Sequence, residues 1–230
     1  MAVEPSQLNT WSHFQNQAPA VFAANHPRLD AMLRAARRLA QFASPALLNV
    51  GVGDGYLELR AYELGWQVYS LDPDAKAIAR LGSAGIRATA GVLEAAPFAD
   101  GQFDFVITSE VLEHLDDTQR KLGLLELARI LKPGGYLIGS VPYCENLQMN
   151  VDVCPKCQHV FHRWGHTRSF DLSEVREMLA AHWQVIACRR TTFVSFRGRD
   201  WRTKFENLAR WIAGKLGLGS PSIFFIAQKL

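Results

Sequence analysis

The feature that most constrains the fold of this chain is a repeated alternation of short apolar runs with segments of helical periodicity. The apolar runs, which predict buried strands, lie at 46–50, 66–71, 86–90, 103–109 and 136–141. The segments with helical spacing lie at 56–64, 73–81 and 117–131. Strands that alternate with helices in this way predict parallel βαβ units, with helices on both faces of the sheet. The sequence therefore predicts a doubly wound α/β domain.

Several segments flank this alternation. We expect residues 1–45 to form an N-terminal helical cap, with a basic amphipathic helix at 29–42, and 46–230 to form the main domain. The rest of the chain is predicted as a Cys/His-rich insert (143–170), a helix (172–181), a strand (183–191), a basic insertion (195–219) and a last strand (223–228).

The charge of the chain is unevenly distributed. The formal net charge is +3, yet residues 189–230 hold nine Lys and Arg against two Asp and Glu, so the preceding residues are net negative. Within the basic end, the apolar side chains of 201–216 share one face of a helical wheel. Three interpretations of this amphipathic segment stay open: packing on the domain, contact with a membrane surface, and contact with nucleic acid.

The sequence also bears on location. No apolar run reaches the roughly 18 residues that a membrane-spanning helix needs. The first residues include Glu4 and Pro5, where a secretion signal would have a basic and then an apolar run. We therefore expect a cytoplasmic protein without a disulfide framework, with peripheral membrane contact through 201–216 as an open alternative.

A glycine-rich turn connects the first predicted strand to the first helix. Gly51, Gly53 and Gly55 permit positive φ angles and close approach of a ligand to the backbone, and the free N–H groups of the helix start face that ligand. Asp72 ends the next strand about 20 residues later, where a carboxylate accepts the hydroxyls of a ribose. The pair predicts a nucleoside ligand. A dinucleotide fingerprint would need glycine at Tyr56, and a Gly-Lys-Ser/Thr phosphate loop is absent.

Further motifs extend this pattern over about residues 46–142. They are the turn Asn49–Gly55, the strand Val68–Pro73, the run Pro97–Val106 and the turn Lys132–Gly135. Together they resemble the class I S-adenosylmethionine (SAM)-dependent methyltransferase family, in its type 11-like form. The resemblance implies a Rossmann-like, seven-stranded sheet whose last strand, 223–228, lies antiparallel beside the fifth. It also implies SAM as the cofactor and methyl transfer as the reaction.

The resemblance implies a set of site residues. The cofactor would be bound by Asn49, Gly51, Gly53, Gly55, Asp72, Leu93, Ser109 and Glu110. Many members of the family carry an acid at the position of Val92 to accept the adenine amino group, so adenine contacts here would fall to the backbone of Leu93. His114 is the candidate catalytic base, because an imidazole can accept the proton of a hydroxyl acceptor. The alternative is that His114 only shapes the pocket.

The insert carries a second candidate site. Cys154, Cys157, His162 and His166 have a spacing that could close a tetrahedron around a structural zinc ion, with His159 or Cys144 as alternative ligands. Two other interpretations stay open: a redox-active Cys-x-x-Cys pair, and a metal-free loop whose histidines serve the acceptor.

These observations predict SAM-dependent methyl transfer and favour oxygen of a small, sugar or lipid-linked acceptor as the methylated atom. One alternative is methylation of RNA through the basic end of the chain. Another is a non-catalytic SAM-fold or zinc-stabilised binding module. The sequence carries no readable code for the acceptor.

Overall fold

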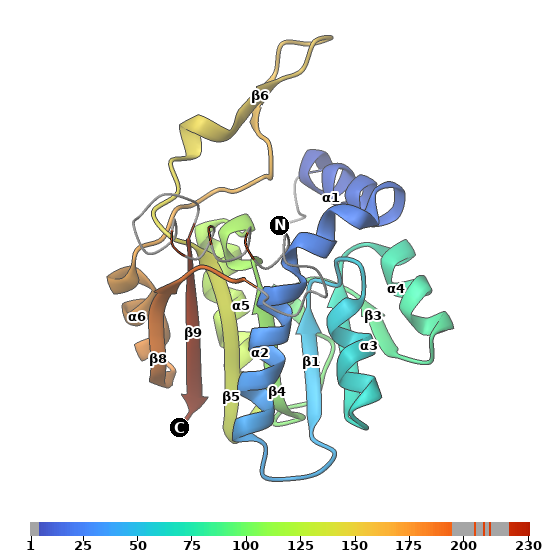
Figure 1. Cartoon of the computed structure of the whole chain (residues 1–230), viewed down its shortest axis with the longest axis vertical. Helices are drawn as coiled ribbons and strands as arrows, with labels where there is room; N and C mark the ends of the chain where they lie inside the picture. The colour runs from blue at the N-terminus through green and yellow to red at the C-terminus, as the bar shows by residue number, and fades with distance from the viewer. Residues whose placement is uncertain (1–4, 195–204, 206–208, 210–211, 213–220) are drawn as a thin grey trace.

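A computed structural model describes residues 5–194, 205, 209, 212 and 221–230 (Figure 1). Most of the basic insertion, 195–219, including most of the predicted helix 201–216, lies outside the described residues. Within the described ranges, no helix is both long enough and apolar enough to cross a bilayer.

The core of the protein is a seven-stranded sheet of order β3-β2-β1-β4-β5-β9-β8. Its strands are β1 (Ala46–Val50), β2 (Gln67–Asp72), β3 (Arg87–Ala90), β4 (Phe103–Ser109), β5 (Leu131–Pro142), β8 (Trp183–Thr191) and β9 (Ser222–Lys229). Neighbouring strands from β3 to β5 pair in parallel, whereas β9 pairs antiparallel with both β5 and β8. The structure thus confirms the predicted doubly wound sheet and its antiparallel last strand.

Helices cover both faces of this sheet (Figure 1). One face is covered by α2 (His26–Leu39), α3 (Tyr56–Glu63) and α4 (Ala75–Ser83), and the other by α5 (Asp117–Ile130) and α6 (Leu172–Ala180). Met32 and Leu57 are buried in the first layer, and Leu127 and Leu179 in the second. Because each such side chain contributes about 1.5–3 kcal/mol when it leaves water, the two layers stabilise the sheet.

The two helices of the second layer begin at local sequence signals. Asp116 accepts a hydrogen bond from the backbone N–H of Gln119, and the Gln119 side chain accepts one from the Asp116 N–H. Asp171 and Glu174 form the same reciprocal pair at the start of α6. Such capping boxes satisfy N–H groups that the first turn of a helix leaves unpaired. They account for the agreement between predicted and observed helix starts.

Two features at the carboxyl edge of the parallel strands go beyond what was predicted in detail. The first lies within the predicted helical cap 1–45, where α1 (Pro5–Gln17) and η1 (Pro19–Asn25) precede α2. The second lies within the Cys/His-rich insert, where η4 (Leu147–Asn150) leads into a hairpin of β6 (Val151–Val153) and β7 (Val160–His162). Figure 1 shows this hairpin projecting away from the body of the molecule, at the same end as α1. The boundary of the N-terminal cap at residue 45 stays a prediction.

Candidate functional site

A cavity lies at the carboxyl edge of the parallel strands, between the glycine turn, the ends of β2 and β4, and the N-terminal helices. Its lining includes every predicted cofactor residue except Gly55, and also includes His114. Those residues are Asn49, Gly51, Gly53, Asp72, Leu93, Ser109 and Glu110. The crevice outside the carboxyl ends of parallel strands is the place where open α/β sheets bind their ligands.

The glycine turn has two structural roles. Gly53 has φ +57°, and a Cβ atom at this position would lie 3.2 Å from Cδ1 of Phe22, so a side chain there would crowd the cavity wall. Gly55 is the left-handed residue before α3, with φ +84°, and its Cβ would lie 2.9 Å from Cδ2 of Leu81. Gly53 therefore keeps the cavity open, whereas Gly55 lets α3 begin close to α4.

Asn49, a buried residue of β1, holds the glycine turn in place through the hydrogen bonds of its side chain. Its Nδ2 donates to the carbonyl oxygen of Gly51 at 3.0 Å and to Oε1 of Glu58 at 2.8 Å. Glu58 is fully buried in α3, and its Oε1 also accepts a hydrogen bond from Ser70 at 3.0 Å. Sequence analysis did not identify Glu58, because its helix shows only which positions are polar and not that this one points into the core.

Burial raises the pKa of Glu58 from its usual 4.5 to about 7, which makes the stability of the protein depend on pH. The folded state binds this proton more tightly than the unfolded chain. The free energy of unfolding therefore falls as pH rises from about 4.5 to about 7, by about 3 kcal/mol for this carboxyl group. We expect Glu58→Gln to remove most of that decrease in urea unfolding measured at about pH 5 and about pH 8.

The exposed Glu63 on the same helix supplies the matched control. Glu63→Gln should leave the pH dependence of unfolding as it is in the unmodified protein. Identical pH dependence in Glu58→Gln and the unmodified protein would contradict the buried, neutral carboxyl group.

Asp72 presents a buried carboxylate at the end of β2. Only 4% of the residue is exposed, and burial raises its pKa. Three donors hold it: the Val52 N–H at 2.8 Å, the Asp74 N–H at 2.8 Å and Nε2 of Gln15 at 2.9 Å. Oε1 of Gln15 is buried without a hydrogen-bond partner among the described residues. The carboxylate is therefore fixed in place, and an unpaired acceptor lies beside it.

Glu110 follows β4 in a conformation that is unusual for a residue other than glycine, with φ +55°. Its Oε1 accepts from Ser140 at 2.7 Å and lies 3.2 Å from Nη1 of Arg28. Nε of Arg28 is buried and has no hydrogen-bond partner within the part of the chain that the structure describes. Strained backbone and unpaired buried donors gather at functional sites, where they are positioned for a ligand.

The N-terminal helices cover the cavity with aromatic side chains. Trp11 and Phe22 both line it, with ring centroids 6.3 Å apart, and Trp11 lies edge-on to His114 at 4.9 Å. Arg80 of α4 fastens this cover, since it donates to the carbonyl oxygens of Gln15 at 3.0 Å and Gly53 at 2.8 Å. Trp11, Gln15 and Phe22 were missed from the sequence, because no motif around them marks them as part of a site.

His114 stands at the rim of the cavity, at the end of η3 (Leu112–His114). Burial, together with the neighbouring His166, lowers its pKa to about 3, so the imidazole is neutral near physiological pH. Its Nδ1 donates to the carbonyl oxygen of Gly165 at 3.2 Å. A neutral imidazole has a free lone pair, but a pKa this low makes it a weak proton acceptor. The role of catalytic base stays a prediction.

The structure divides the four predicted zinc ligands into two pairs. Cys154 and Cys157 lie at the tip of the β6–β7 hairpin, where backbone N–H groups of the tip lower the pKa of the Cys154 thiol. His162 pairs with Val151 at the other end of the hairpin. Since strands rise about 3.3 Å per residue, roughly 10 Å separates the two ends, which is too far for one tetrahedral ion. In this structure the predicted four-ligand zinc site is not assembled.

Part of the chain is similar in sequence to known methyltransferases. Residues 48–139 match a family model described as a methyltransferase domain. An uncharacterised methyltransferase of Mycobacterium sp. (strain KMS) is 33% identical over 97 residues, which make up 40% of this chain and 36% of that relative. The chain thus matches about a third of the length of this curated relative.

Two solved structures resemble nearly the whole chain. One is a Burkholderia thailandensis 1,6-didemethyltoxoflavin-N1-methyltransferase with bound 1,6-didemethyltoxoflavin and S-adenosylhomocysteine; it has a TM-score of 0.66, 20% identity, and coverage of 97% of this chain and 86% of that one. The other is the N-methyltransferase NodS from Bradyrhizobium japonicum WM9 with S-adenosylhomocysteine; it has a TM-score of 0.64, 16% identity, and coverage of 98% and 99%. At these identities the likeness shows a shared fold.

Proposed function

We propose that this chain is a class I SAM-dependent methyltransferase that transfers the methyl group of SAM to oxygen of a small, sugar or lipid-linked acceptor. One observation carries the proposal. The glycine turn, the Asp72 carboxylate and the Arg28–Glu110 pair all border a single cavity at the carboxyl edge of the sheet. In this arrangement the glycine turn and the Arg28–Glu110 pair would hold the methionine end of SAM, and Asp72 would hold the ribose.

The residues of the cavity fit this cofactor. Asp72 and the unpaired Oε1 of Gln15 would accept the ribose hydroxyls. Arg28 would bind the methionine carboxylate through its buried, unpaired Nε, and Glu110 would bind the ammonium group. Val92 offers no side-chain acceptor to adenine, so that contact is assigned to the backbone of Leu93.

When bound, SAM supplies an electrophilic methyl group on a sulfonium, which becomes a neutral thioether after transfer. The chain contributes alignment and exclusion of water. Trp11 and Phe22 cover the cavity, and the strained Glu110 backbone fixes the end of β4 beside it. Oxygen is the acceptor atom we favour, because His114 lines the cavity and its neutral imidazole could accept a hydrogen bond from a hydroxyl group and orient it, although its low pKa makes it a weak base.

The shape of the site supports a small acceptor. The aromatic side chains that line the cavity leave a largely apolar space, which suits a compact molecule better than a folded RNA. The basic amphipathic segment 201–216, which could contact a membrane or RNA, lies mostly outside the described residues. Methylation of RNA is therefore one outcome of the test below and no part of the proposal.

Two measurements test the proposed function. Isothermal titration of the full chain should show that SAM binds with one site per chain, and that S-adenosylhomocysteine binds to the same site. Labelled-methyl SAM incubated with a cell extract and the protein should then place label in the small-molecule or lipid fraction. Absence of SAM binding would contradict a SAM-dependent enzyme. Label found only in the RNA fraction would contradict the acceptor class while leaving the cofactor assignment in place.

A further inference from the structure

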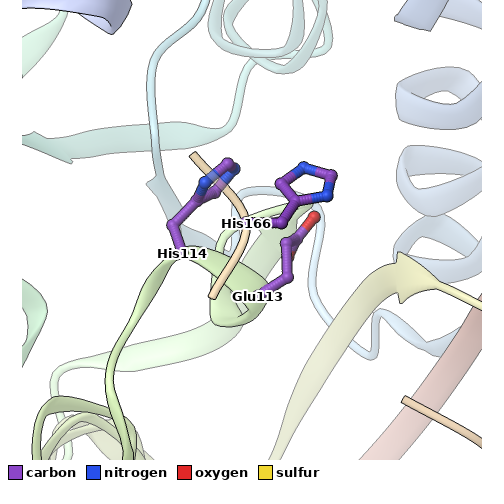
Figure 2. A group of neighbouring side chains, drawn as sticks. All are labelled: Glu113, His114 and His166. Carbon is purple, nitrogen blue, oxygen red and sulfur yellow. The ribbon is translucent and has the colours of Figure 1, made fainter. Parts of the chain in front are cut away.

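Three side chains from two distant parts of the chain meet beside the SAM cavity. They are Glu113 and His114 of η3 and His166 of the insert, and each offers a ligand atom within 4.8 Å of the others. Figure 2 shows the rings of His114 and His166 turned toward each other, with the Glu113 carboxyl group beside His166. The cluster is held together by Thr167, whose N–H and hydroxyl donate to the carbonyl oxygen of Glu113 at 2.8 and 3.0 Å.

The buried carboxyl group of Glu113 is the first indication that this cluster binds a ligand. It has no exposed surface, and neither of its carboxyl oxygens has a hydrogen-bond partner among the described residues. The nearby Arg28 forms its ion pair with Glu110. Since burying an unpaired carboxyl group is costly, this position calls for a cation or a donor that the described side chains do not supply.

The Nδ1 atoms of the two imidazoles are both engaged by oxygen acceptors. Nδ1 of His114 donates to the carbonyl oxygen of Gly165 at 3.2 Å, and Nδ1 of His166 contacts the Glu145 carboxylate. A ring whose Nδ1 carries the proton keeps its free lone pair on Nε2. Metal-bound histidines are held in this way, with the distal N–H donated to a backbone carbonyl or a carboxylate. The Glu145 carboxylate is itself fixed by Asn150, which donates to Oε1 at 2.7 Å.

His162 has a different role. Its Nδ1 accepts from the backbone N–H groups of Trp164 at 3.3 Å and His166 at 3.1 Å. The proton of its neutral ring must then lie on Nε2, which is 3.5 Å from Oε1 of Glu145. This Nε2 is buried and forms no hydrogen bond among the described residues. In this tautomer His162 has no lone pair free for an ion.

From this geometry we propose that Glu113, His114 and His166 bind a divalent transition-metal ion such as zinc, with Glu145 and the Gly165 carbonyl as their outer partners. Two imidazole nitrogens and one carboxylate form a ligand set that suits such ions. The site joins the insert to the rim of the cavity. Cys154 and Cys157 take no part in it.

Three protein ligands leave a coordination position for water or a substrate oxygen. Because His114 belongs both to the cluster and to the cavity wall, an acceptor hydroxyl could reach that position. The ion would then lower the pKa of the hydroxyl in place of an imidazole base, and the proton would pass to solvent. This consequence rests on the proposed function, whereas metal binding itself stands on the geometry of the cluster.

Zinc binding to the full chain provides the test. After chelator treatment and dialysis, we expect the protein to take up one equivalent of zinc at this site. His166→Ala and the isosteric Glu113→Gln should each weaken that uptake at least about tenfold, as expected for the loss of a ligand. The double variant Cys154→Ser/Cys157→Ser should retain it. Co²⁺ in the same site should show no thiolate charge-transfer band.

Binding of SAM is the second readout, since neither Glu113 nor His166 lines the cavity. Both variants should bind SAM as the unmodified protein does, which separates failure of the metal site from misfolding and from failure of the proposed function. Zinc uptake that is lost in the Cys variant, with a thiolate band for Co²⁺, would overturn the proposal. Unchanged uptake in both His166→Ala and Glu113→Gln would overturn it as well.

Discussion

Replacing Asp72 with Ala should weaken SAM binding at least about 100-fold. In our proposal the carboxylate accepts hydrogen bonds from the ribose, and a hydrogen bond to a charged group contributes about 1.5–3 kcal/mol, where each 1.4 kcal/mol is tenfold in affinity. The substitution also leaves the Val52 and Asp74 N–H groups without their acceptor, which loosens the glycine turn. Isothermal titration of the variant with SAM measures the loss.

Asp74 offers a matched control two residues along the chain. It caps α4 by accepting from the N–H groups of Lys76 at 2.7 Å and Ala77 at 2.9 Å, and its other carboxyl oxygen accepts from Nδ2 of Asn16 in α1 at 3.0 Å, but it does not line the cavity. Asp74→Ala should therefore cost about 1 kcal/mol of stability while SAM affinity stays within about threefold. If both variants lose the same SAM affinity, the loss comes from disturbed packing of this segment and not from a missing hydrogen bond to the ribose.

Replacing Gly139 with Ala should lower the free energy of unfolding by about 3 kcal/mol, more than the other single substitutions we predict to affect folding. Gly139 lies in the middle of β5, and a Cβ atom there would come 2.3 Å from Cζ of Phe225 and 2.6 Å from Oγ1 of Thr108. Both neighbours are fully buried, so neither can move without disturbing the packing around it. Urea unfolding followed by circular dichroism gives the change in the free energy of unfolding.

The same substitution at Gly82 should not lower the free energy of unfolding. Gly82 lies in α4, and nothing is within 4 Å of the position its Cβ would take. Alanine is favoured over glycine in a helix by up to about 1 kcal/mol, so Gly82→Ala should be neutral or stabilising. A Gly139→Ala protein as stable as the Gly82→Ala protein would mean that β9 does not pack on β5 as described.

The sheet and most of its helices were predictable from the sequence, because the signals for them are local. A buried parallel strand is a short apolar run, and a helix start is a capping residue such as Asp116 or Asp171. The positions that border the cavity follow from the same logic, since Gly53 and Asp72 each lie at the carboxyl end of a strand.

Contacts between distant segments were not predictable in this way. The Gln15–Asp72 hydrogen bond joins residues far apart in the chain, and nothing in the local sequence around Gln15 marks it as part of a site. The spacing of Cys154, Cys157, His162 and His166 resembled a single zinc site, yet the hairpin separates the thiols from the imidazoles. Spacing along a chain limits which residues can meet, but the intervening backbone decides which ones do.

The sequence by itself determined the order of strands and helices and the edge of the sheet at which a nucleoside ligand would bind. Apolar periodicity, caps and glycine turns act over a few residues, so they can be recognised without knowing the fold. Only the tertiary structure placed α1 over the cavity and brought His166 to Glu113 and His114. Those arrangements depend on how an N-terminal helix and an insert pack against η3 and the glycine turn, and that packing arises from many weak contacts that no short motif encodes.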